Sequence, residues 1–195
     1  MKLGKYTWIY LVITLGLIAT AGIAYASFAD KGEILGSSFS VGSADIKLLI
    51  DITGGVDDSN LTDQLNGPSF TNITPNWEED YLVKLYNNAS TALQLTTNAD
   101  YLTANDPDDL RSIIYVEPIP WNDINNNGIV ESGETSTSIG KKTIVKWKTE
   151  GFDLGSLTSG EVKGFILKFS TGTISETKQG KTAIFDFEFN SVSLE

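Results

Sequence analysis

The 195-residue chain contains no cysteine and no histidine, and each absence narrows the range of possible functions. Without cysteine it can form no disulfide, so an exported form must be held by its core, by metal ions or by neighbours in an assembly. Without histidine it lacks the commonest zinc ligand and the commonest general base. Several enzyme classes, including zinc peptidases with a His-Glu-x-x-His motif, are therefore disfavoured, and we expect a protein that is not an enzyme.

Basic residues are also scarce. The chain has 14 Lys and Arg against 25 Asp and Glu, for a formal net charge of −11. A surface of this sign repels nucleic acid and anionic membranes and attracts cations. We therefore expect no nucleic-acid partner. Acidic surfaces also keep many secreted proteins soluble, so the charge alone does not identify a metal site.

The first 26 residues have the pattern of a signal peptide. Lys2 and Lys5 form a short basic region, and a largely apolar run follows from residue 8 to residue 26. The run ends at Ala24 and Ala26 in an Ala-x-Ala pattern, which predicts cleavage by signal peptidase before Ser27. The alternative is an uncleaved anchor, because the run is long enough to span a bilayer. In both cases the rest of the chain is exported to the cell surface or beyond, and only this segment meets the membrane.

From residue 27 onward, apolar residues mostly alternate with polar ones, the period of a half-buried strand. Short strands are expected at residues 38–50, 81–86, 92–97, 113–116, 143–148, 164–170 and 183–192. Pro118 and Pro120 are expected to close the fourth of these, and a brief helix is expected at 106–111. The pattern predicts an all-β, jelly-roll-like β-sandwich over residues 36–195, with an N-terminal signal helix.

Residues 123–134 match the complete twelve-residue calcium-loop pattern, Asp-x-Asx-x-Asx-Gly-x5-Glu. Oxygen atoms at alternating positions of a tightly wound loop suit a hard cation, and Gly128 permits the chain reversal. The predicted Ca²⁺ ligands are Asp123, Asn125, Asn127, the carbonyl of Ile129, Glu131 and Glu134. No amphipathic helices flank the loop, so we expect a structural calcium-loop insertion between strands. The alternative is an Asn- and Gly-rich hairpin without metal.

Two further acidic clusters, at residues 57–58 and 105–109, could supply more oxygen ligands. Such clusters are more often solvated loops or helix N-caps, and we favour that interpretation. Exposed aromatic residues could instead stack on sugars, and Trp77, Tyr101 and Trp121 are the candidates, although packing in the core or in turns is the commoner use.

Two pairs of motifs in the first half of the chain stand in the order of a known family. The first pair is Ser-Phe-Ala-Asp at 27–30 and the strand at 36–48, and the second is Ile-Thr-Pro-Asn at 73–76 and the strand ending in Asn-Asn-Ala at 87–89. They resemble, in that order, the Phe-x-Asp step, the first strand, the Leu-x-Pro-Gly turn and the following strand of the TasA/camelysin-type secreted proteins. The likeness extends to about residue 100. Asn76 and Ala89 depart from it, since glycine is usual at both positions.

This resemblance implies a jelly-roll subunit of an extracellular filament or tube, as in a biofilm matrix. In such fibres the N-terminal segment freed by signal peptidase inserts into the next copy as a donated β-strand, giving a head-to-tail homopolymer. The donor would be residues 27–35, with Phe28, Ile34 and Leu35 as its apolar side chains. In the alternative, this segment is an ordinary edge strand of its own domain. A monomeric calcium-binding adhesin and a camelysin-like metallopeptidase are the competing functions.

Overall fold

The computed structural model describes residues 38–41, 45–68, 70, 73–178 and 181–194. They belong to a compact unit, Gly36–Glu195. The predicted signal peptide, its cleavage site and the donor residues Phe28, Ile34 and Leu35 all lie outside the described residues. Among the described residues, no helix is long and apolar enough to cross a membrane.

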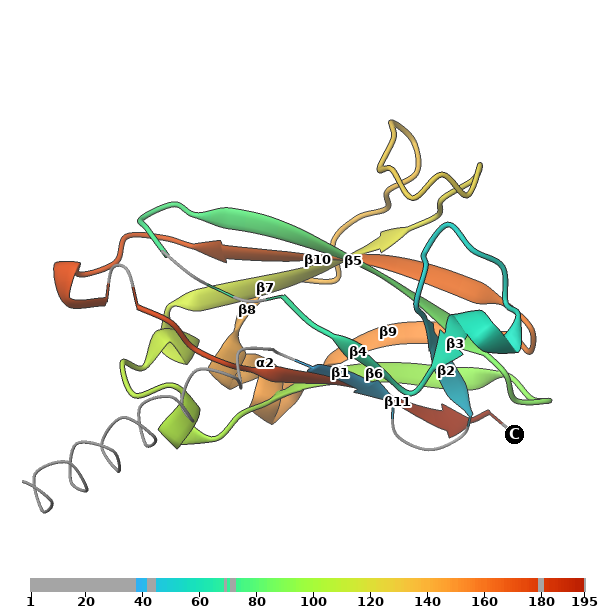
Figure 1. Ribbon diagram of the computed structural model, residues 1–195, viewed down its shortest axis with the longest axis horizontal. Helices are drawn as coiled ribbons and strands as arrows, with labels where there is room; N and C mark the ends of the chain where they lie inside the picture. Colours follow the sequence, from blue (N-terminus) through green and yellow to red (C-terminus); the bar gives the residue numbers. More distant parts are fainter. Residues whose placement is uncertain (1–37, 42–44, 69, 71–72, 179–180, 195) are drawn as a thin grey trace, which may run out of the picture. The chain divides into compact units, whose positions relative to one another are not determined.

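Strands are the main regular structure of the described residues and form two sheets, labelled in Figure 1. In spatial order the first sheet contains β4 (Gln64–Asn66), β1 (Ser38–Val41), β11 (Asp186–Ser193), β6 (Leu93–Asp100) and β9 (Phe152–Leu157). The second contains β3 (Leu61–Thr62), β2 (Ile46–Leu49), β5 (Glu78–Asn87), β10 (Val162–Thr171), β7 (Ile114–Trp121) and β8 (Lys142–Thr143). The predicted all-β class is confirmed at this level.

Helical structure is brief. The α-helix α2 covers Ile144–Glu150. Single 3-10 turns are η1 (Asp58–Asn60), η2 (Thr103–Asn105), η3 (Leu110–Ser112) and η4 (Glu176–Lys178). The brief helix expected at 106–111 is therefore only the turn η3, and it begins later than predicted.

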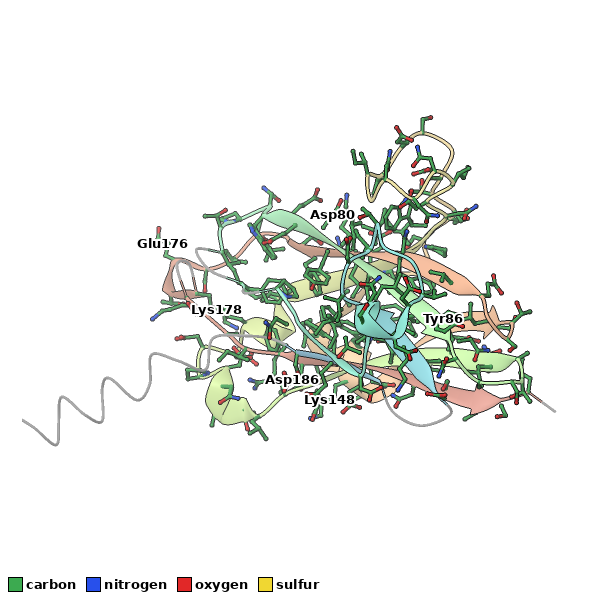
Figure 2. All side chains as sticks on the ribbon, turned by 45° about the vertical axis from the view of Figure 1, so that its right-hand side comes forward. Asp80, Tyr86, Lys148, Glu176, Lys178 and Asp186 are labelled. Carbon is green, nitrogen blue, oxygen red and sulfur yellow. The ribbon has the colours of Figure 1, made fainter. Side chains whose placement is uncertain are left out.

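Aromatic side chains from the two sheets meet in the core. Phe39 of β1 stacks on Tyr81 of β5 with ring centroids 4.8 Å apart, and Phe169 of β10 lies 5.4 Å from Phe187 of β11. Phe39, Phe169 and Phe187 are completely buried. The alternation predicted for 164–170 and 183–192 is thus confirmed, with one face of each strand in the core. Charged side chains such as Asp80 and Asp186 lie exposed around it (Figure 2).

The strand predicted at 143–148 is wrong, because this segment forms α2. Thr143 caps the helix by accepting a hydrogen bond from the Lys146 N–H at 3.3 Å. Ile144 and Trp147 are one helical turn apart and both are fully buried. Gly151, with φ of 62°, ends the helix in a conformation that side chains disfavour. The three apolar residues of this short run fit either period, and the cap decides between them.

The prediction that Pro118 and Pro120 end a strand is also wrong, since β7 continues through both to Trp121. The carbonyl of Pro118 accepts the Ile139 N–H and that of Pro120 accepts the Ser136 N–H. Within a strand, the N–H and C=O of one residue point to the same side. The missing N–H groups therefore face the irregular segment 135–139 and not β10, so the ladder between β7 and β10 loses no bond.

Candidate functional site

The predicted calcium loop connects the end of β7 to β8 and is part of the yellow segment that projects from the sheet in Figure 1. Its two ends are tied together where it leaves the strand. The Asn122 N–H donates to the Glu134 carbonyl at 2.8 Å, and Trp121 forms a β-bridge with Thr135. The loop therefore folds as a closed unit at the edge of the second sheet.

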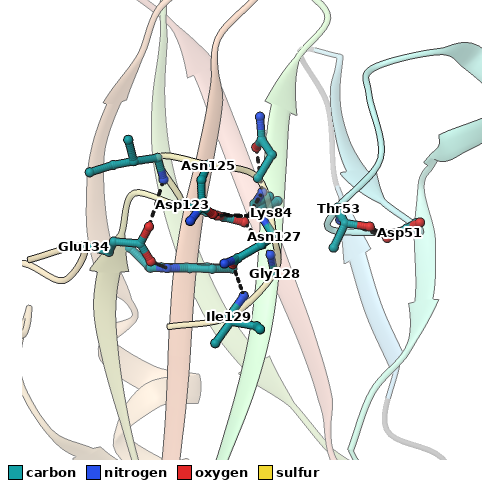
Figure 3. A network of polar contacts seen from close by, with 12 residues as sticks. Asp51, Thr53, Lys84, Asp123, Asn125, Asn127, Gly128, Ile129 and Glu134 are labelled. Carbon is teal, nitrogen blue, oxygen red and sulfur yellow. Dashed lines mark hydrogen bonds and ion pairs between the residues drawn. The ribbon is translucent and has the colours of Figure 1, made fainter. Parts of the chain in front are cut away.

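The alternating Asx residues wind the loop through side-chain to backbone hydrogen bonds (Figure 3). Asp123 accepts the N–H of Asn127 at Oδ1 and that of Gly128 at Oδ2, at 3.1 and 2.8 Å. Asn125 Oδ1 accepts the Asn127 N–H at 3.1 Å, and Asn127 Oδ1 accepts the Ile129 N–H at 2.7 Å. Apart from Asp123 Oδ2, which also accepts from Lys84, each of these oxygens retains a lone pair for another partner. The alternating Asx residues of the sequence pattern thus form consecutive Asx turns.

Two positions in this winding have left-handed backbone conformations. Asn126 has φ of 55° and Gly128 has φ of 71°. At Gly128 a side chain would also meet the neighbouring loop, because an added Cβ would lie 2.7 Å from Thr53 Cγ2. Gly128 is therefore needed for its conformation and for close contact with that loop.

Glu134, the last predicted ligand, is 5 % exposed. Its Oε1 accepts the Ile124 N–H at 3.0 Å, and its Oε2 accepts the Trp121 Nε1–H at 3.2 Å and the Glu131 N–H at 3.1 Å. Burial raises the pKa of Glu134, but these donors outweigh it and hold the pKa below its ordinary value. The carboxylate is thus kept ionised inside the loop.

Asp123, the first predicted ligand, already holds a cation. The ammonium of Lys84 lies 3.0 Å from Asp123 Oδ2 and 3.2 Å from Asn126 Oδ1. The side chains of Lys84 and Asp123 are only 4 % and 1 % exposed. Burial raises the pKa of Asp123, but the bonds from Lys84 and from the Gly128 and Asn127 N–H groups lower it overall.

The sequence interpretation missed Lys84. It lies in β5 with the buried Val83 and Leu85 on either side of it, and its partner Asp123 is 39 residues further along the chain. A lysine in an alternating strand is normally read as a solvated outward residue. No local signal pairs it with the loop.

A second loop lies beside the first (Figure 3). Asp51 Oδ1 accepts hydrogen bonds from the Thr53 N–H and hydroxyl at 2.8 and 2.7 Å. These bonds lower the pKa of Asp51, with a further contribution from the charge of Lys84. Asn60 fixes the loop by donating to the carbonyls of Asp51 and Gly55. This exposed carboxylate adds negative charge near the calcium loop.

The described residues show whether the predicted ligands surround a common point, as a metal site requires. All six predicted ligands lie in one loop, but no group of three or more acidic, His or Cys side chains among the described residues is placed to hold a metal ion. Glu131 instead accepts the Asn125 amide N–H at 2.8 Å, and Glu134 is turned toward peptide N–H donors. The oxygen-only donor set suits Ca²⁺ chemically, but the Lys84 ammonium at Asp123 would have to be displaced. Coordination would require both glutamates to rotate inward.

The other sequence candidates have structural roles. In the cluster 105–109, Asp106 Oδ1 accepts the Leu110 N–H and its Oδ2 accepts the Arg111 N–H, although the N-cap residue of η3 is Asp109, whose side chain makes no cap bond. Trp121 is 2 % exposed, Trp77 packs edge-on against Phe70, and Tyr101 packs against Phe185.

Comparisons with known proteins identify no relative: no family model matches the chain, and no curated protein and no solved structure gives a significant match. The case for a function is therefore built on the loop, the two sheets and the sequence pattern.

Proposed function

We propose that this chain is an exported, calcium-binding jelly-roll subunit that assembles head-to-tail into an extracellular filament or tube. The observation that carries the calcium part is the Asx-wound loop 123–134, whose winding gathers the candidate oxygen ligands in one closed unit. The assembly part rests on the signal-like N-terminus, the segment that follows it and the likeness to TasA/camelysin-type proteins.

Calcium would be held by the side-chain oxygens of Asp123, Asn125, Asn127, Glu131 and Glu134 and by the Ile129 carbonyl. When bound, the ion would neutralise the loop's carboxylates and cross-link its two halves. Two amide ligands in place of carboxylates reduce the ligand charge, so we expect an affinity at the weak, extracellular end of the range. The loop's role is structural, because strands and not paired helices flank it.

The position of β1 supports strand exchange. β1 lies parallel to β11, with Phe39 opposite Phe187, and it begins three residues after the proposed donor segment 27–35. The first sheet thus takes up a strand from the N-terminal side of the chain. A donor from a neighbouring copy would add to a sheet edge by the same backbone hydrogen bonds. Four of the described strands lie at the edges of the two sheets, and the longest of these edge strands is β9, with six residues.

A monomeric calcium-binding adhesin is the second candidate. The surroundings of the aromatic side chains proposed to stack on sugars argue against an adhesin that binds sugars in this way. Trp121 is buried beside the loop, and the face of Tyr101 is occupied by Lys148, whose Nζ lies 4.5 Å from the ring centroid. An adhesin would therefore need another binding surface.

Electron microscopy of residues 27–195 tests the proposal, with millimolar calcium and with chelator. We expect ordered filaments or tubes with calcium and fewer or none with chelator. A chain that begins at residue 36 is the matched control and should stay monomeric, because it lacks the donor. Dispersed particles from 27–195 under both conditions would refute the assembly role and favour the adhesin.

A further inference from the structure

Lys84 reaches the calcium loop because three residues in register form a row across the second sheet. Lys84 of β5 is paired with Gly164 of β10, and Gly164 is paired with Trp121 of β7. Gly164 has no side chain to block the row, and a Cβ there would lie 3.0 Å from Trp121 Cε3. The lysine Nζ consequently lies 5.3 Å from the Trp121 ring centroid and meets Asp123 beyond it.

A lysine that is 3 % exposed needs compensation for the water it has lost. Its ammonium has the Asp123 carboxylate, the Asn126 amide oxygen and the face of Trp121. The closest of these partners, Asp123, is also the first predicted calcium ligand. The ammonium and a calcium ion would therefore compete for the same carboxylate, and their charges would repel.

We propose that Lys84 is a built-in counter-cation that keeps the calcium loop folded without metal and lowers its affinity for calcium. This inference rests on the proposed calcium binding. In the metal-free protein the ammonium neutralises Asp123. When calcium binds, Nζ leaves Oδ2 and turns into the open pocket of about 220 Å³ that Lys84, Trp121, Asn122, Asp123 and Asn126 line among others.

Both consequences of removing the charge act in the same direction. Without the ammonium, Asp123 in the metal-free loop is a buried carboxylate with no cationic partner, which destabilises that state. In the calcium-bound loop a repulsive charge is gone. Calcium binding to Lys84→Met should therefore be at least about tenfold tighter than to wild type. Lys84→Gln keeps a hydrogen-bond donor without the charge, so it should show an intermediate or similar gain.

The test is calorimetric titration of the full chain with calcium in mild detergent, together with the calcium-induced rise in melting temperature. The matched control is Lys168→Met on the neighbouring strand β10, where a half-buried lysine pairs with Glu78 at 3.7 Å and leaves the loop untouched. This control should bind calcium like wild type. If Lys84→Met does not fold without metal, it can be purified with calcium and titrated with a chelator of known affinity.

The possible results separate the two claims. Tighter binding by Lys84→Met, or binding by this variant alone, supports the inference. Equal affinity in wild type and both Lys84 variants would overturn it and leave the calcium site standing. If neither wild type nor any variant binds calcium, the proposed calcium function itself has failed, and the inference fails with it.

Discussion

Two ion pairs among the described residues set a buried aspartate against a cation and differ in origin. Asp106 binds Arg111, only five residues away, and its carboxylate accepts three N–H donors from the turn η3 that follows it. Asp123 binds Lys84 from a strand 39 residues earlier in the chain. The first pair is completed by its own segment, whereas the second exists only because a loop folds over a sheet. This difference suggests a fixed role for Asp106 and an exchangeable cation for Asp123.

The largest effect is expected from Asp106→Ala. Its side chain is 0 % exposed, and its removal leaves two peptide N–H groups without their acceptor, whereas the Arg111 guanidinium keeps Asp109 Oδ1 at 2.9 Å. We expect a loss of about 4 kcal/mol in the free energy of unfolding, the same with and without calcium. Urea unfolding measures it. Asp108→Ala, which removes a surface pair to Lys181 at 3.7 Å, is the control and should cost less than about 0.5 kcal/mol.

Asp123→Ala should cost somewhat less, about 3 kcal/mol in the absence of calcium. The Lys84 ammonium left behind keeps Asn126 Oδ1 and the Trp121 ring and can turn into the open pocket. Any stabilisation by calcium should disappear in this variant, whereas Asp106→Ala retains it. Unfolding curves with calcium and with chelator make the comparison. A calcium response that survives in Asp123→Ala would remove this residue from the ligand set.

Gly128→Ala should cost about 2 kcal/mol, because an alanine at φ of 71° is strained and its Cβ would meet Thr53 Cγ2. The second substitution Thr53→Ser removes the contacting methyl group, keeps the hydroxyl that donates to Asp51 and leaves the backbone strain. The double variant should therefore recover about half of the loss. No recovery, as measured by melting temperature, would show that the contact between the two loops is not tight.

Acid should produce the smallest change. The pKa values of Asp123 and Glu134 are lowered in the folded protein. Their contribution to stability is therefore fully present above the pKa values of the unfolded chain, and it is lost as the pH falls through the pKa values of the folded protein. The metal-free protein should lose stability below about pH 4.5, and Glu134→Gln should flatten this loss. Chemical unfolding at a series of pH values between about 6 and about 3 provides the measurement. An equally steep profile in the variant would assign the acid sensitivity to other carboxylates.

Much of the sheet structure could be read from the sequence because it depends on strong alternation. The clearest case is Phe185, Phe187 and Phe189, which alternate with other residues along one segment and are all fully buried. The strand β9 was not predicted, since Gly155 interrupts it and its partner β6 is far away in sequence. The helix α2 was misread because its apolar residues satisfy both periods over so short a run.

The sequence by itself determined the β-rich class, the apolar face of the main strands and the winding of the loop, because each depends on residues close together in the chain. The alternation selects strands, and Asx residues at every second position fold their own backbone. Only the tertiary structure decided that β7 passes through two prolines and that the Lys84 ammonium binds Asp123, the first predicted ligand of the loop. Both outcomes depend on which distant segment lies alongside: the irregular segment 135–139 beside the prolines, and β5 beside Asp123.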